Sequence, residues 1–256
     1  MIDIPEYLSP SSIGTFQTCP LKFKYSRIDR LIDPPTEATV LGNFVHSTLE
    51  GLFALPAEDR TLSTARTVMR DVWEQEWGVK AVEVLNQDRN ALREFRWKAW
   101  WCVENYFTLE DPWSFEPAGV ETGLDGNVGK ARVKGFIDRW EINEDGKIVI
   151  SDYKTGKTPR PQWTDDKFQQ LFIYAVLLSS ETGNEIERLN LLYLKDGTVL
   201  TRPVTDESLA QVVETVESVY DSVNEYCEAG EFPAVKNKLC DWCSYKKICP
   251  AWARNR

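Results

Sequence analysis

The segment from residue 135 to residue 157, GFIDRWEINEDGKIVISDYKTGK, has the pattern of one tight β-hairpin. Apolar residues alternate along both halves, and the four residues 143–146 (NEDG) supply a reversal between them. If Gly146 takes the left-handed position of a three-residue loop with a bulge, Asn143 pairs with Lys147. The turn therefore predicts which residues of the two strands face each other.

This register brings two carboxylates and a lysine together. Asp138 falls opposite Asp152, and Lys154 projects from the same face because it lies two residues further along. Two opposed carboxylates repel each other unless a cation lies between them, and a hard divalent ion such as Mg²⁺ or Mn²⁺ suits oxygen ligands. Such an ion activates water for phosphodiester hydrolysis, while the lysine orients the water or offsets charge on the phosphate. The alternative is an exposed hairpin with surface ion pairs only.

The hairpin resembles the RecB-like branch of the PD-(D/E)xK nuclease superfamily, in which a G-x-x-D strand precedes a D-Y-K-T-G strand end. Residues 135–138 (GFID) and 152–156 (DYKTG) carry the match, with Asp where many relatives have Glu. Downstream, FQQLFIYA places Gln170 and Tyr174 at the positions of the Q-x-x-x-Y helix motif. By resemblance these two side chains hold the lysine or contact the DNA backbone. Their alternative role is a polar contact between helix and sheet.

The same resemblance extends upstream to His46, the one histidine of the chain, in LGNFVHSTLE. It implies that His46 binds metal, although a lone helical histidine is more often a satisfied polar group. Glu121 lies where relatives often carry an additional acid, but a strand glutamate also suits a solvated face. The implied metal ligands are His46, Glu121, Asp138, Asp152 and the backbone carbonyl of Tyr153. The other implied site residues are Lys154, Gln170 and Tyr174.

Four of the six cysteines form a second pattern, with Cys240, Cys243 and Cys249 within ten residues and Cys19 far upstream. Such thiols suit a soft metal centre, but spacing alone leaves structural zinc, an iron-sulfur cluster and reduced core cysteines open. The lone-plus-three spacing resembles the iron-sulfur nucleases of the RecB-like type, which include the AddB nuclease domain and the CRISPR-associated RecB-like exonucleases. That resemblance implies a [4Fe-4S] cluster.

The remaining patterns predict an α/β fold with a mixed central sheet flanked by helices, which the resemblance makes a restriction-endonuclease-like nuclease core. One helix is expected from Ser11 to about Asp29. We expect one domain over residues 1–256. Its parts are N-terminal helices with Cys19 and His46 (1–56), a helical insertion (57–112), the nuclease core (113–204), and a C-terminal helix with the cysteine segment (205–256).

The helical insertion is dense in tryptophan, and these rings have two interpretations. Their helical spacing favours core packing between helices. The alternative is a platform on which the bases of single-stranded DNA stack. The tryptophans in question are Trp73, Trp77, Trp97, Trp100 and Trp101.

The net charge of -10 argues against nucleic acid at first, but its distribution is uneven. Residues 22–30 carry +3 and residues 236–256 carry +5, which leaves -18 for the rest of the chain. These two basic stretches flank the four cysteines. We therefore expect the cluster to act as a clip that joins the two chain ends and assembles one basic surface beside the nuclease cleft.

The function predicted from these patterns is metal-dependent DNA hydrolysis. By resemblance, an exonuclease acting on single strands or DNA ends is favoured over an endonuclease with the same site. The alternative from another class is a DNA-end-binding or recombination scaffold subunit that docks on a helicase or recombination partner. The sequence has no run of about 18 apolar residues and MIDIPEYLSP does not resemble a signal peptide, so we expect a cytoplasmic protein without membrane contact.

Overall fold

The computed structural model describes residues 2–253, and its centre is a five-stranded sheet in the order β1-β2-β3-β4-β5. All neighbouring strands are antiparallel except β3 and β4, which are parallel and joined by the crossover helix α7 (Asp165–Thr182). The predicted mixed sheet flanked by helices is confirmed. The strands are β1 (Gly119–Val128), β2 (Ala131–Ile142), β3 (Ile148–Lys154), β4 (Ile186–Tyr193) and β5 (Thr198–Pro203).

The turn between β2 and β3 has the predicted form. Gly146 has a φ of 75°, and its N–H donates to the Asn143 carbonyl at 3.0 Å. The Asn143 N–H donates to the Lys147 carbonyl at 2.8 Å, which closes the three-residue loop. Further along, Arg139 faces Ser151, so the predicted register of the hairpin is confirmed.

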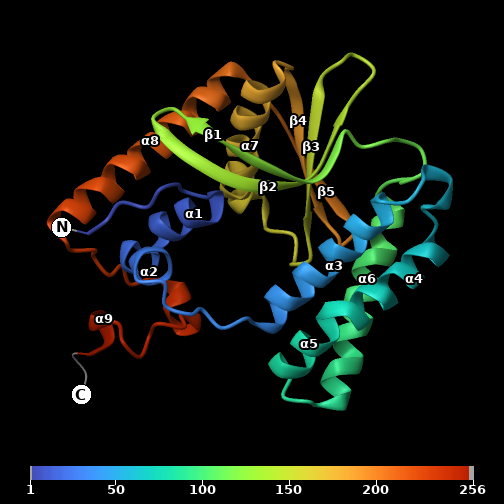
Figure 1. Ribbon diagram of the computed structural model, residues 1–256, viewed down its shortest axis with the longest axis horizontal. Coiled ribbons are helices and arrows are strands. Elements are labelled where there is room, and N and C mark those ends of the chain that lie inside the picture. The colour runs from blue at the N-terminus through green and yellow to red at the C-terminus, as the bar shows by residue number, and fades with distance from the viewer. Residues whose placement is uncertain (1, 254–256) are drawn as a thin grey trace.

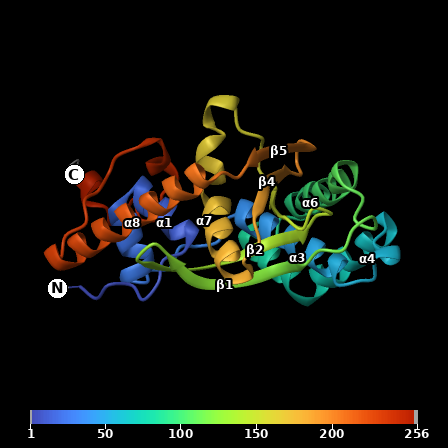
Figure 2. The ribbon, with the colours of Figure 1, turned by 90° about the horizontal axis from the view of Figure 1, so that it is seen from above.

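Helices pack on the sheet in two groups that form two cores (Figures 1 and 2). The first core contains α7 and α8 (Asp206–Ala229), the N-terminal helices, and the strand residues that face them, such as Ile148 and Ile150. The second contains α3 to α6, with Tyr153 and Leu192 reaching it from the sheet. The helices of the second group are α3 (Glu37–Phe53), α4 (Leu62–Val72), α5 (Gly78–Val84) and α6 (Arg89–Leu109), with a π-helical turn (Trp73–Trp77) after α4.

The N-terminal helix is shorter than predicted, because it breaks at Cys19. It begins as α1 (Pro10–Thr18), capped by Ser9, and resumes as α2 (Pro20–Phe23) followed by a π-helical turn (Lys24–Ile28). Pro20 lacks an N–H and disfavours helical backbone at the residue before it, so Cys19 is extended with φ of -164°. The prediction of one continuous helix was therefore wrong, and the break places Cys19 on a bend.

The C-terminal segment follows α8 (Asp206–Ala229) back to the N-terminal helices (Figure 1). It contains a 3-10 turn (Lys238–Trp242) and the short α9 (Pro250–Ala253). The Leu21 N–H donates to the Pro233 carbonyl at 3.1 Å, and the Tyr25 and Tyr245 rings are 5.4 Å apart. The two ends of the chain thus pack together. Within residues 2–253 no helix combines the length and apolar character needed to cross a membrane.

Candidate active site

Three acidic residues occupy neighbouring positions on three adjacent strands. Glu121 of β1 lies between residues that pair with Arg139 and Ile137 of β2, which puts it opposite Asp138, and extending the Arg139–Ser151 pairing by one residue puts Asp138 opposite Asp152 of β3. Glu121 has a φ of 44°, a left-handed conformation that an extended strand does not otherwise contain. Carboxylates this close repel one another unless protons or cations lie between them.

His46 of α3 completes this row from outside the sheet. Its Nδ1 lies 3.4 Å from Asp138 Oδ1 and 3.9 Å from Glu121 Oε1. One ligand atom from each of these three residues lies within 4.8 Å of the other two, so the group can hold a metal ion. His46 Nε2 donates to the Tyr153 carbonyl at 2.8 Å, which directs Nδ1 toward the carboxylates. A carbonyl has two lone pairs, so this bond leaves one for a cation.

The two central aspartates are buried and held by different partners. Asp138 is 8% exposed, and its Oδ2 accepts a hydrogen bond from the Tyr153 N–H at 2.7 Å. Asp152 is 3% exposed, and its Oδ2 lies 2.6 Å from Lys154 Nζ. Tyr153 therefore fixes Asp138 with its N–H and His46 with its carbonyl. The predicted placement of Lys154 on the same face as Asp152 is confirmed.

The electrostatics of the row favour bound protons when no cation is present. Burial and the Asp138 charge raise the pKa of Asp152 to about 6 and the pKa of Glu121 to about 7. Burial lowers the pKa of His46, but the Asp138 carboxylate beside it has the larger combined effect and raises this pKa to about 9. Burial also opposes the charge of Lys154, but attraction to Asp152 raises its pKa. A divalent cation would satisfy these groups in place of protons.

Helix α7 packs against this part of the sheet through Tyr174. Gln170 Nε2 donates to the Tyr174 hydroxyl at 3.2 Å, so the two predicted residues share one side of the helix. The Tyr174 ring lies against Gly135 of β2, where an added Cβ would come within 2.5 Å of it. The absence of a side chain at this position lets α7 approach the carboxylates.

The sequence did not reveal Arg139, which supports the site from the opposite face of the sheet. Its side chain is 1% exposed and forms a two-pronged ion pair with Glu110 at 2.5 and 2.8 Å. The same guanidinium donates to the hydroxyls of Ser151 at 3.2 Å and Tyr153 at 3.4 Å. Arg139 therefore anchors the side chain of the residue whose backbone holds Asp138 and His46. Arg139 is one of several charged residues of β2, so no feature of the sequence set it apart.

The four predicted cysteines come together at the packed chain ends. Cys19, Cys240, Cys243 and Cys249 are half-buried and line one cavity together with aromatic residues such as Tyr25. Two of the basic residues expected near them, Arg254 and Arg256, lie outside the described residues.

Two phage proteins are similar to this chain over nearly their whole length. The Gene 69 protein of Mycobacterium phage L5 is 23% identical over 290 residues, covering 95% of this chain and 96% of that protein. The Gene 69 protein of Mycobacterium phage D29 is 24% identical over 275 residues, with the same two shares.

A solved structure and a family comparison agree with the geometry. The crystal structure of a presumed exonuclease from Eubacterium rectale has a TM-score of 0.63 at 14% sequence identity, covering 98% of this chain and 89% of that chain. This likeness shows a shared fold. The sequence model of the PD-(D/E)XK nuclease superfamily matches residues 7–250, a range that contains the whole row of carboxylates, His46 and Lys154, so the chain belongs to this superfamily.

Proposed function

We propose that this protein is a metal-dependent nuclease that hydrolyses DNA phosphodiester bonds at the His46, Glu121, Asp138 and Asp152 group. The observation that carries the proposal is the ligand group of His46, Glu121 and Asp138 beside the Asp152–Lys154 pair. Mg²⁺ and Mn²⁺ prefer oxygen ligands with an occasional imidazole, which is the donor set present here. The combination also supports placing the chain in the RecB-like branch.

Each side chain has a distinct task in this proposal. A divalent cation in the group would lower the pKa of a bound water and polarise a phosphate oxygen. The Tyr153 N–H holds Asp138 in place, and Nδ1 of His46 faces the carboxylates because Nε2 is already engaged. The ammonium of Lys154 can orient the attacking water or offset negative charge on the phosphate. Gln170 and Tyr174 support Lys154 or contact the DNA backbone.

Within DNA hydrolysis, we propose exonuclease action on single strands or DNA ends. The resemblance to the RecB-like branch favours this activity, and the Eubacterium rectale protein of similar fold is a presumed exonuclease. An endonuclease would use the same residues. A circular single-stranded substrate separates the two, because an exonuclease cannot cut a strand without ends.

The test is degradation of labelled single-stranded DNA with Mg²⁺ or Mn²⁺ and after chelation by EDTA. Wild type should degrade the DNA only with metal, and Asp152→Ala should abolish cleavage. Asp145→Ala is the matched control, because Asp145 is an exposed aspartate in the turn of the same hairpin. Equal degradation by wild type and Asp152→Ala would overturn the catalytic assignment.

We further propose that Cys19, Cys240, Cys243 and Cys249 hold a [4Fe-4S] cluster. The four half-buried thiols line one cavity at the packed chain ends, and four cysteine thiolates are the ligand set of such a cluster. Anaerobically purified protein should be brown and contain iron. A colourless protein with stoichiometric zinc would overturn this assignment.

A further inference from the structure

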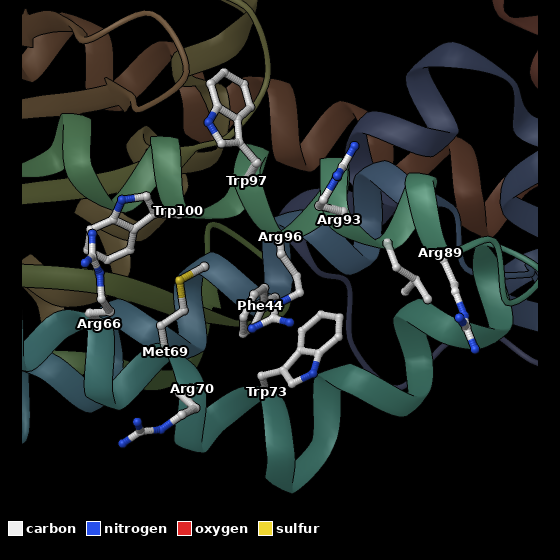
Figure 3. A pocket seen from close by; sticks show the side chains of 11 residues that line it. Phe44, Arg66, Met69, Arg70, Trp73, Arg89, Arg93, Arg96, Trp97 and Trp100 are labelled. Carbon is white, nitrogen blue, oxygen red and sulfur yellow. The ribbon is translucent and has the colours of Figure 1, made fainter.

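The helical insertion contains a pocket of about 730 Å³ that is separate from both sites described above (Figure 3). Phe44 of α3 lies deep in it, and α4 and α6 supply most of the other lining residues. Arginines and aromatic rings dominate the lining. The arginines are Arg66, Arg70, Arg89, Arg93 and Arg96, and the tryptophans are Trp73, Trp97 and Trp100.

The pocket arises where one stripe of α4 meets one stripe of α6. The lining positions of α4 and the following turn are 66, 69, 70 and 73, and those of α6 are 89, 92, 93, 96, 97 and 100. Both series repeat every three or four residues, which places each on a single helix face. Neither series alone shows that the two sets of arginines converge. Their convergence depends on how α4 and α6 pack.

The charge of this pocket is not balanced by its own lining. The lining contains five arginines and no carboxylate, although the chain as a whole carries -10. Among residues 2–253, these five arginines form one ion pair with a carboxylate, between Arg70 and its exposed neighbour Asp71 at 3.8 Å. Arg66 lies over the Trp100 ring at 4.5 Å and Arg96 over the Trp73 ring at 5.2 Å. The rings thus support the guanidinium planes, and their charge remains available to an anion.

One aromatic ring of the lining also faces solvent. Trp97 is 60% exposed and stacks on Trp101, with the ring centroids 5.6 Å apart and an interplanar angle of 17°. Trp77, by contrast, is buried in the core, so the tryptophans of the insertion serve two different roles. An exposed, already stacked pair of indoles offers a flat face to a further ring.

A short series of contacts connects this pocket to the catalytic lysine. The Trp97 ring stacks on the Trp101 ring, and Trp101 Nε1 donates to the Lys195 carbonyl at 3.1 Å. The neighbouring Leu194 N–H donates to the Lys154 carbonyl at 2.9 Å. Lys154 and the exposed rim of the pocket are therefore joined through the turn between β4 and β5.

We propose that the Arg/Trp pocket binds single-stranded DNA a few nucleotides away from the bond being cut, with its arginines on phosphates and Trp97 stacked on a base. The volume fits a nucleotide or two and excludes a duplex, whose bases offer no free faces. The inference rests on the proposed nuclease function and adds a second DNA contact to it. The Arg/Trp pocket differs from the basic chain ends, because it would contact the faces of bases as well as phosphates.

The first test is binding of a fluorescent 20-nucleotide single strand in EDTA, where no cleavage takes place. Reversing two charges in Arg93→Glu/Arg96→Glu should weaken binding at least tenfold and reduce the slope of log K against log salt by about 1.4. The control is Lys130→Glu/Lys147→Glu, the same charge change in two sheet turns away from α4 and α6 (Figure 1). Equal weakening by both double variants would overturn the proposal.

A second test isolates stacking. Trp97→Ala should weaken binding of the single strand at least fivefold and leave binding of a 20-base-pair duplex within twofold. Trp113→Ala is the matched control, since Trp113 is 50% exposed and lies outside the pocket. Equal loss in both tryptophan variants, or equal loss for single strand and duplex, would contradict stacking in the pocket.

These binding tests can fail independently of the proposed nuclease activity. If wild type binds the strand through the pocket but degrades no DNA with Mg²⁺ or Mn²⁺, the nuclease proposal fails and the pocket stands. If wild type degrades DNA while all variants bind the strand as wild type does, the pocket proposal fails and the nuclease proposal stands.

Discussion

At the scale of single residues, the buried Asp138 and Asp152 and the half-buried Glu121 lower the stability of the protein while they offer ligands for a cation. Three carboxylates on adjacent strands destabilise a sheet, because the negative charge of each one makes ionisation of its neighbour less favourable. His46 and Lys154 relieve only part of this repulsion, since the pKa of Asp152 remains raised to about 6. The metal-free protein should therefore become less stable where these groups ionise.

In EDTA, the Asp152→Asn variant measures how much the ionised Asp152 carboxylate lowers the free energy of unfolding. A carboxyl whose folded pKa is raised from 3.8 to about 6 loses stability as pH rises through that interval, and the penalty is full above it. We expect the variant to unfold like wild type at pH 4 and to be more stable by roughly 1–3 kcal/mol at pH 8. Urea unfolding at both pH values checks this, and a variant less stable than wild type at pH 8 contradicts it.

His46 should couple metal binding to proton release. Because its pKa is raised to about 9, the imidazole is protonated at pH 7.5 and must lose that proton to bind a cation through Nδ1. The affinity for Mn²⁺ should rise up to about tenfold per pH unit between pH 7.5 and 9 and then level off. Calorimetry in two buffers of different ionisation enthalpy measures the released proton. His46→Gln should release fewer protons, and an unchanged number would exclude His46 as the source.

Glu121 tests the backbone at the site. A residue with a Cβ at φ of 44° costs about 1 kcal/mol that glycine does not. Glu121→Gly should therefore be more stable than Glu121→Ala by about 1 kcal/mol in denaturant unfolding, while both bind Mn²⁺ more weakly than wild type. Equal stability of the two variants would show that this conformation is not strained.

Part of this site could be predicted from residues alone. The turn residues determine the register, and the register determines the neighbours of Asp138. Arg139 could not be predicted, because its ion-pair partner Glu110 lies at the end of a helix 29 residues upstream. The conformation of Glu121 was equally hidden, since no local turn residue signals a positive φ there.

At the scale of elements, the site depends on how closely α7 approaches β2. Gly135→Ala would place a methyl group within 2.5 Å of the Tyr174 ring, so helix or ring must shift. We expect a loss of roughly 1–3 kcal/mol in unfolding free energy and slower cleavage, because Gln170 and Tyr174 move with the helix.

Gly14→Ala in α1 is the control for this substitution. An added Cβ there has no neighbour within 4 Å, and alanine is the better helix former, so stability should rise by about 0.5–1 kcal/mol with cleavage unchanged. A Gly135→Ala protein with the stability and activity of wild type would show that the close packing is dispensable.

Elements with strong periodicity matched the sequence, and elements interrupted by proline did not. The strands of the hairpin formed on both sides of the predicted turn, and the expected C-terminal helix begins directly after Thr205. The N-terminal helix broke at Pro20, where apolar spacing continued but the backbone could not. The break nevertheless serves the fold, because it turns Cys19 toward the C-terminal thiols.

At the scale of the whole molecule, long-range packing determines the features that the sequence could not reveal. The cysteines suggested that the chain ends meet, because a shared metal centre needs ligands from both. No comparable motif predicted that the arginines of α4 lie near those of α6, since each helix has the pattern of an ordinary amphipathic segment. The arginines of the insertion therefore add a third group of basic residues to the two basic stretches of the sequence near the chain ends.

Removing one ligand of the proposed cluster tests whether the joined ends contribute to DNA binding. If the proposed cluster is present, Cys19→Ala should lose its iron and expose the C-terminal segment to protease, because Cys19 is the one proposed ligand supplied by the N-terminal helices. The sheet also packs on α3 to α6 in the second core, which contains none of the four proposed ligand cysteines, so its circular dichroism should persist while the affinity for single-stranded DNA falls several-fold. Cys102→Ala, which removes a buried thiol of α6 outside the cluster, should retain both iron and affinity. Full DNA affinity in an iron-free Cys19→Ala protein would leave the Arg/Trp pocket, and not the chain ends, as the principal DNA contact outside the cleft.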